Sequence, residues 1–227
     1  DLYREPLEIA VCAQHNNGGL AGNLWWESVN IKHLFPVGEV NGTHGVTRPG
    51  GSALNAGQVG GIRAAEYIAS RYRERTLSMS QCEESIRSKV AEMFDWIKKC
   101  EHSEIGWEQE RDAFQARMSR AGAHIRSQED VSAALSEAWD QWHRVEGNGM
   151  RFKSPADLAE AFRNRYLCYA HAVYLEAILF ALRSGLGSRG SALVLDRKGI
   201  PVHGSLGEEW RFTPENPIFR EKVLETF

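Results

Sequence analysis

The sequence predicts an α+β protein that is mostly helical. Apolar segments short enough to be strands occur near the start of the chain, a helix rich in small residues follows them, and amphipathic helical patterns dominate from about residue 77. We therefore expect two parts. Residues 1–76 hold the strands and the small-residue helix, and residues 77–227 hold a helical bundle with an irregular tail.

Two short strands are predicted in the first part. Residues 7–11 alternate between apolar and polar side chains, and residues 34–37 form an apolar run that ends at Gly38. Glu39 follows directly, where the carboxylate at a strand end can accept hydrogen bonds from a ribose or ribitol hydroxyl. This order is typical of a nucleotide or flavin site.

A helix is expected from Ser52 to about Arg71, with Ser52 as its cap. Each glycine inside a helix costs roughly 1 kcal/mol relative to alanine, so close contact with a sheet or cofactor must compensate. The small residues of this helix are Ala53, Ala56, Gly57, Gly60, Gly61, Ala64 and Ala65.

The segment before this helix indicates a binding site. Gly50 and Gly51 let a ligand approach the backbone, and the first N–H groups of the helix favour an anionic or electron-rich group. Arg48 has a planar guanidinium that suits a carboxylate, although a loop arginine also binds backbone carbonyls. His44 either fixes its glycine-bounded loop or acts in proton transfer or substrate binding.

Four helices are expected in the second part. A capping box at Ser80 and Glu83 starts the first, whose apolar stripe should face inward. The second covers about residues 108–121, the third begins at Ser127, and the fourth runs from Ser154-Pro155 to about Arg183. The stripe of the first helix consists of Ile86, Val90, Met93 or Phe94, and Ile97; the third helix should bury Val131, Leu135, Ala138 or Trp139, and Trp142.

Composition excludes several classes of protein. The net charge of -3 and 42% apolar residues describe a soluble globular chain with no nucleic-acid partner. No run reaches the roughly 18 apolar residues of a membrane span and no signal segment is seen, which predicts a cytoplasmic protein. The four cysteines are widely spaced, so we expect free thiols and no metal site.

The segment from Leu34 to Leu54 resembles the second flavin-contacting motif of the succinate dehydrogenase and fumarate reductase flavoprotein family, which includes L-aspartate oxidase. The resemblance implies FAD as the cofactor. It also implies that Glu39 holds the ribityl or ribose part and that the N–H groups of Ala53 and Leu54 meet the N1/C2=O edge of the ring. Arg48 would serve the substrate carboxylate. The matching residues are Gly38-Glu39, His44-Gly45, Arg48, Gly50 and Leu54, with Gly51 and Ser52 completing the cofactor-binding segment.

The helical part resembles the C-terminal domain of the same family over residues 118–135 and at residues 187–190. Gly187 replaces the family's glutamate, and Leu193 or a neighbour replaces its histidine. In the family, a further H-x-T-x-G-G segment carries a histidine that contacts the substrate carboxylate. Here Gln14 aligns with that histidine and Asn16 with the threonine. Either His15 substitutes for it, or the pocket is neutral and amide-rich and takes a different molecule.

No G-x-G-x-x-G fingerprint for the FAD pyrophosphate opens the chain. We therefore expect the C-terminal part of a longer enzyme, inactive alone, whose missing N-terminal FAD and capping domain is its partner. Residues 1–76 would be a capping-domain remnant and the C-terminal part of the FAD-binding domain. An open sheet edge predicts a possible homo-oligomer.

The resemblance implies hydride transfer between flavin and an activated C=C bond next to a carboxylate, with a small carboxylate as substrate and Arg48 and His44 as catalytic residues. Two alternatives remain. One is an amino-acid oxidase of the L-aspartate oxidase type, and the other is a non-catalytic helical interaction module.

Overall fold

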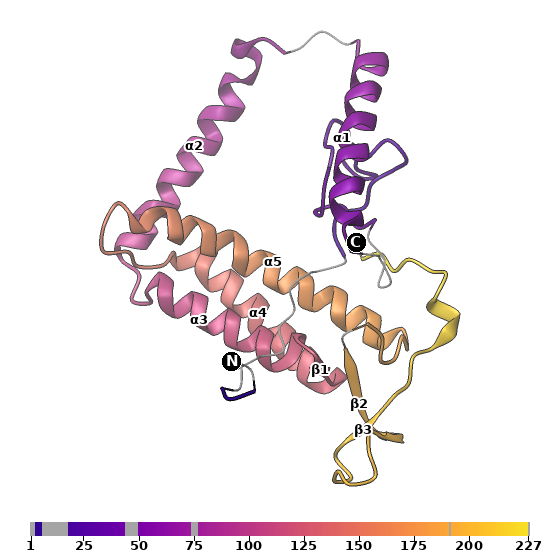
Figure 1. Ribbon diagram of the computed structural model, residues 1–227. Coiled ribbons are helices and arrows are strands. Elements are labelled where there is room, and N and C mark those ends of the chain that lie inside the picture. The colour runs from indigo at the N-terminus through magenta and orange to yellow at the C-terminus, as the bar shows by residue number, and fades with distance from the viewer. Residues whose placement is uncertain (1–2, 6–17, 44–49, 74–76, 191, 227) are drawn as a thin grey trace. The chain divides into compact units, whose positions relative to one another are not determined.

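The computed structural model describes residues 3–5, 18–43, 50–73, 77–190 and 192–226 (Figure 1). Within these ranges the protein is α+β and mainly helical, as the sequence predicted, with five α-helices and a small three-stranded sheet. The chain divides into two compact units, Asp1–Glu74 and Arg75–Phe227. In the described residues, no helix has the length and apolar character that crossing a bilayer requires.

Helix α1 (Ser52–Arg71) has the predicted bounds, but its start differs from the expectation. Gly51 occupies the cap position in the left-handed conformation, with φ of 79°, and no side chain caps the helix. Ser52 is the first helical residue, so its predicted role as the cap is wrong. Glycine adopts this conformation without the steric cost that a Cβ atom brings.

Residues 34–37 form no strand, contrary to prediction. Leu34 is exposed, Pro36 is buried, and no described strand pairs with this segment. Proline lacks the N–H group that a ladder needs, and apolar character alone does not supply a neighbouring strand. The other predicted strand, at residues 7–11, lies outside the described residues.

The small-residue face of α1 does lie against another part of the chain, as predicted. A Cβ atom at Gly60 would lie 2.5 Å from the ring of Trp26, and one at Gly57 would lie 3.4 Å from the Cα of Gly38. The contacting segments are loops rather than a sheet. Trp26 is buried, so its ring packs between its own loop and the helix.

Helix α2 (Met79–Glu101) is capped two residues before the predicted cap. The hydroxyl oxygen of Ser78 accepts a hydrogen bond from the N–H of Gln81, and the Gln81 side chain accepts one from the N–H of Ser78. The predicted box of Ser80 and Glu83 is therefore wrong, because the same motif two residues earlier takes its place.

The apolar stripe of α2 does not face inward over most of its length. The side chains of Ile86, Val90, Met93 and Phe94 are 43–60% exposed, and only Trp96 and Cys100 near the end of the helix are buried. The first turns of α2 extend beyond the other helices of this unit (Figure 1). The prediction of a buried stripe is therefore wrong for these turns.

The remaining helices agree with the predicted pattern. They are α3 (Trp107–Arg117), continued by a π-helical turn (Met118–Gly122), α4 (Gln128–Asn148) and α5 (Asp157–Arg183). Ser127, where the sequence predicted the helix to begin, is the cap of α4, because its hydroxyl oxygen accepts the N–H of Asp130. Helix α5 starts later than expected, because the Asp157 carboxylate accepts the N–H groups of Lys153 and Ser154 and closes a turn around Pro155.

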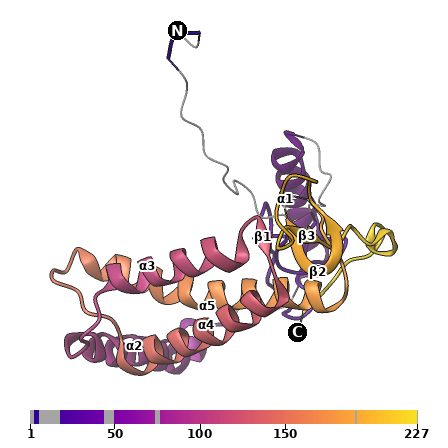
Figure 2. The same ribbon diagram turned by 90° about the horizontal axis from the view of Figure 1, so that it is seen from below.

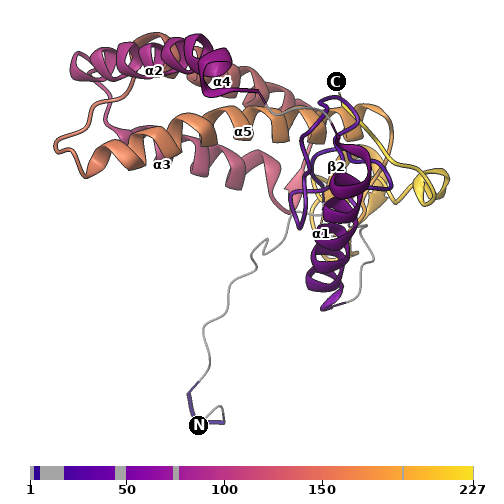
Figure 3. The same cartoon turned by 90° about the horizontal axis from the view of Figure 1, so that it is seen from above.

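Helices α3, α4 and α5 run side by side (Figures 2 and 3) and bury two apolar clusters. The predicted inward residues of α4, Val131, Leu135 and Ala138, belong to the first cluster, with Trp139 partly buried against it. The second cluster contains Trp96 of α2, and Trp142 packs against it. The core of the Arg75–Phe227 unit thus lies between these helices.

The tail contains strands that the sequence analysis does not predict. β1 (Ile125–Arg126) pairs in parallel with β2 (Leu193–Pro201), which pairs in antiparallel fashion with β3 (Arg211–Phe212). A 3₁₀ turn (Pro217–Phe219) follows. The predicted irregular tail is therefore partly a sheet.

Candidate functional site

The start of α1 is the centre of the predicted site. Gly50 and Gly51 are exposed, and among the described residues nothing lies within 4 Å of the position that a Cβ atom would take at either one. Ala53 is half-buried and Leu54 is 76% exposed. A helix of 20 residues therefore begins at an open, glycine-lined surface, where its N–H groups and dipole favour negative charge.

Glu39 lies in a tight turn that packs on the second turn of α1. The N–H of Asn41 donates to the carbonyl of Gly38 at 3.1 Å, and Gly38 has φ of 94°. We call residues 38–42 the Glu39 turn. Because Gly57 contacts Gly38, this turn lies beside the helix while Glu39 itself stays exposed.

Asn41, in the same turn, is buried and has no hydrogen-bond partner for either side-chain atom. It is 2% exposed, and a Cβ atom added at Gly22 would lie only 2.5 Å from its Nδ2. A buried amide normally finds partners for its donor and acceptor. The Glu39 turn thus contains polar groups that the described part of the chain leaves unpaired.

These described residues fit the group that the resemblance implies. An open helix N-terminus suits the electron-rich edge of a flavin ring, and an exposed carboxylate on a fixed turn suits a polyol hydroxyl. Gly50, Gly51, Ser52, Ala53 and Leu54 lie together at the helix start.

Several predicted site residues lie outside the described residues. They are Arg48 and His44, which come between the Glu39 turn and α1 in the sequence, and the proposed substrate-contacting residues Gln14, His15 and Asn16.

Glu27 is a buried acid that the sequence analysis did not single out. Its carboxylate accepts the N–H of His33 at 3.0 Å and the hydroxyl of Tyr72, which follows the end of α1. The Tyr72 hydrogen bond lowers the pKa of Glu27, and the same contact raises the pKa of Tyr72 to about 12. The sequence signal that could have identified it is an acidic residue directly after Trp25 and Trp26. The arrangement joins the loop to the end of α1 and is structural.

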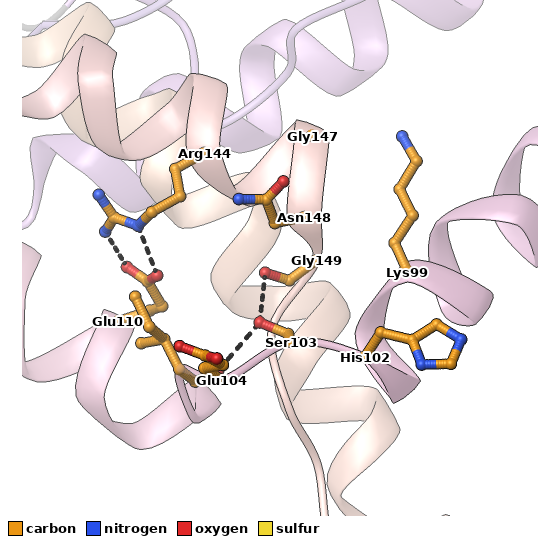
Figure 4. Close-up of a pocket in the computed structure, with 10 residues that line it drawn as sticks. Lys99, His102, Ser103, Glu104, Glu110, Arg144, Gly147, Asn148 and Gly149 are labelled. Atoms are coloured by element: carbon orange, nitrogen blue, oxygen red, sulfur yellow. Dashed lines mark hydrogen bonds and ion pairs between the residues drawn. The ribbon is translucent and has the colours of Figure 1, made fainter.

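A separate pocket of about 600 Å³ lies in the Arg75–Phe227 unit, between the ends of α2 and α4 and the start of α3 (Figure 4). Lys99 and His102 line one side, and Arg144 and Glu110 the other. The Glu110 carboxylate is fully buried and accepts two hydrogen bonds from Arg144, at 2.8 and 3.2 Å. None of the predicted site residues that the structure describes lines this pocket.

The described residues hold no group of three His, Cys, Asp or Glu side chains arranged to bind a metal ion. Cys82, Cys100 and Cys168 are free thiols there. Burial raises the pKa of the Cys168 thiol to about 12, which makes it unreactive near neutral pH.

The chain has relatives among known proteins, although no protein-family model matches it. It is 34% identical over 138 residues to a protein of Methanothermobacter marburgensis that is named as a subunit of a CoM/CoB fumarate reductase; the match covers 60% of this chain and 24% of that protein. It is also 34% identical over 99 residues to an uncharacterised FAD-dependent oxidoreductase from Methanocaldococcus jannaschii, covering 43% of this chain and 18% of that protein.

The chain thus spans about a quarter or less of the length of these relatives. Their names agree with the resemblance that the glycine-rich segment carries. The chain is therefore similar to FAD-dependent flavoproteins of the fumarate reductase type.

Proposed function

We propose that this chain forms part of an FAD-dependent oxidoreductase that transfers a hydride between flavin and an activated C=C bond next to a carboxylate. The open N-terminus of α1 beside the Glu39 turn is the observation that carries the proposal. The similarity to two flavoprotein relatives supports it. Both relatives are much longer, so we further propose that the chain acts together with an FAD-binding and capping part.

Residues at the helix start would bind the cofactor and adjust its electronic properties. A bound flavin supplies the hydride chemistry. The N–H groups of Ala53 and Leu54 would stabilise negative charge near N1 and O2 of the ring without reorganisation, because the helix already orients them. Glu39 would accept hydrogen bonds from the polyol chain, and Gly50 and Gly51 would let the ring approach the backbone.

Arg48 would hold the substrate carboxylate through two parallel hydrogen bonds and so fix the reacting carbons next to the flavin. His44 would either fix this loop or move a proton. Gln14, His15 and Asn16 would line the remaining pocket, where amide groups in place of a histidine favour a substrate other than a simple dicarboxylate.

The proposal is tested in the full reading frame that encodes this chain. The purified protein should be yellow and should bleach on reduction, and Arg48→Ala should abolish turnover of fumarate-like acceptors while flavin absorbance stays largely intact. Arg71→Ala is the matched control, because Arg71 is exposed in the last turn of α1, at the opposite end of the helix from the proposed site. A colourless protein, or Arg48→Ala with unchanged turnover, contradicts the proposal.

A second assay separates the two enzyme types. The proposed reaction predicts turnover with unsaturated carboxylates under a reductant. Turnover of amino acids with oxygen, in the absence of C=C reduction, would instead identify an amino-acid oxidase.

A further inference from the structure

The Glu39 turn is held by contacts with a second loop, which we call the Trp26 loop (residues 18–29). The N–H of Leu20 donates to the carbonyl of Val40 at 2.8 Å, and the N–H of Gly42 donates to the carbonyl of Leu20 at 3.0 Å. A Cβ atom at Gly19 would lie only 2.3 Å from the Val40 carbonyl oxygen. The two loops therefore lie backbone against backbone, and a shift of one displaces the other.

The Trp26 loop is in turn joined to α1 by several side chains: Arg63 donates to the carbonyl of Leu24, the ring of Tyr67 stacks on Trp25, and Trp26 packs on the helix itself. Trp26 is 7% exposed and has φ of 64°. A Cβ atom added at Gly60 would lie 2.5 Å from two carbons of the Trp26 ring. Such a distance is below any normal contact, so even one added methyl group must displace the ring. Gly61, the next residue, behaves differently, since the nearest atom to its Cβ position is a Val37 methyl carbon at 3.8 Å.

These contacts form a closed series from α1 through Trp26 and the two loops back to α1. The last contact of the series joins Gly38 to Gly57, since a Cβ atom added at Gly57 would lie 3.4 Å from the Cα of Gly38. Trp26 and Asn41 inside this series are buried, but Glu39 is exposed beside the start of the helix. The packing therefore controls where an exposed carboxylate stands relative to the N–H groups of α1.

We propose that Gly60 and Trp26 are positioning residues for the cofactor: the missing Cβ of Gly60 lets Trp26 pack on α1, and Trp26 thereby holds the Glu39 turn at the correct place beside the helix N-terminus. Neither residue touches the ligand. The inference rests on the proposed function, because the turn is positioned for a flavin polyol chain.

The test uses the full reading frame with its cofactor. Flavin is removed and titrated back, and its dissociation constant is followed by flavin fluorescence, well below the unfolding temperature. Gly60→Ala should weaken flavin binding about tenfold or more, which corresponds to about 1.4 kcal/mol. The control Gly61→Ala, which adds the same methyl group to the neighbouring turn position without a clash, should leave the dissociation constant within about twofold.

A rescue variant distinguishes positioning from general loss of stability. Trp26→Leu in the Gly60→Ala background makes room for the added methyl group and should recover part of the flavin affinity, together with the near-UV circular dichroism of the bound flavin. If Gly60→Ala does not fold, Trp26→Phe replaces it, since a smaller ring loosens the contact without a clash and should also weaken flavin binding.

The outcomes separate this inference from the proposed function. A wild-type protein that binds no flavin overturns the proposed function. A wild-type protein that binds flavin, with Gly60→Ala or Trp26→Phe folded and binding it equally well, overturns the positioning role.

Discussion

Three buried side chains in the described residues keep a polar atom without a hydrogen-bond partner: Asn41, Asn164 and His171. An unsatisfied buried polar group costs on the order of 1–3 kcal/mol, so native proteins contain few of them. Asn41 lies in the Glu39 turn, before the proposed cofactor-binding segment in the sequence. Asn164 and His171 lie on α5 in the helical bundle, and of these two only the histidine can titrate.

His171 makes the bundle sensitive to acid. It is 7% exposed, and burial together with the positive charge of Arg117 lowers its pKa from 6.5 to about 4. Between these pH values the unfolded chain binds a proton at this position and the folded chain does not. The stability that the neutral ring contributes is complete above pH 6.5 and is lost as the pH falls towards 4, by up to about 3 kcal/mol.

Urea unfolding at pH 7, 6, 5 and 4 measures this effect. His171→Leu should remove most of the decrease in the free energy of unfolding over that range, because the group that takes up the proton is gone. His143→Leu, which removes an exposed histidine of α4, should keep the wild-type decrease. An unchanged slope in His171→Leu would assign the acid sensitivity to other groups.

At the scale of single elements, helix α2 shows that an amphipathic stripe does not reveal what covers it. Phe94 and Trp96 are two residues apart, yet Phe94 is 60% exposed and Trp96 is 2% exposed. The Trp96 indole N–H donates to the carbonyl of Val145 at 2.9 Å, and its ring packs on Phe162. Trp96→Ala should therefore lower the free energy of unfolding by about 3–5 kcal/mol, and Phe94→Ala should lower it by less than about 1 kcal/mol.

Thermal unfolding followed by far-UV circular dichroism compares the two variants. Equal losses in Phe94→Ala and Trp96→Ala would mean that the stripe of α2 is buried in solution, as the sequence alone predicted.

A buried ionic network joins α3 to α4. The Glu110 carboxylate accepts hydrogen bonds from Arg144 and from the Gln141 amide, at 2.7 Å for the latter, and Gln141 in turn accepts one from Arg117. Removing one partner of a buried pair leaves an uncompensated charge and is costlier than removing both. Arg144→Met should lower the free energy of unfolding by about 3 kcal/mol. Water that reaches the half-exposed position of Arg144 makes this loss smaller than for a fully buried pair.

A double-mutant cycle checks this prediction. Adding Glu110→Gln to Arg144→Met should restore part of the lost free energy of unfolding, because the buried charge disappears with its partner. Additive losses in the double variant would show that the two side chains are not energetically coupled.

Helix bounds could be predicted from sequence because their signals are local. Helices α1 and α5 end at the predicted Arg71 and Arg183, and α4 begins one residue after the predicted Ser127. The prediction of a strand at residues 34–37 was wrong because a strand forms only when a second strand pairs with it, and that is not a local signal. The short strands near the chain end were missed because their pairing joins residues far apart in the sequence.

The sequence could predict the candidate site only at positions where a glycine indicates the backbone conformation. Gly50 and Gly51 predicted a helix start, and α1 does begin there, with Gly51 in the left-handed conformation; the binding role of this helix start stays a prediction. Asn41 gave no such signal, because its importance comes from the close approach of two loops. No sequence pattern encodes that approach.

For the whole molecule, the two units differ in how much core they contain. Both buried apolar clusters belong to Arg75–Phe227, whereas the described residues of Asp1–Glu74 bury only three apolar side chains, Trp26, Pro36 and Ala64, beside the polar Glu27 and Asn41. Folding free energy comes mainly from apolar burial, and a unit of this size with so small a core is marginal. The helical unit should therefore fold alone, and the first unit should depend on a cofactor or on further protein contacts.

Expressing the units separately tests this difference. Residues 75–227 should keep their helical circular dichroism and unfold cooperatively at a temperature close to that of the intact chain, because their core clusters are complete. Residues 1–74 should show no cooperative transition in calorimetry, since a single tryptophan packed on a glycine does not offset the loss of chain entropy. A sharp calorimetric transition of residues 1–74 in the absence of any ligand would mean that the Trp26 loop and α1 need nothing further to fold. The proposed site would then be preformed before the cofactor arrives.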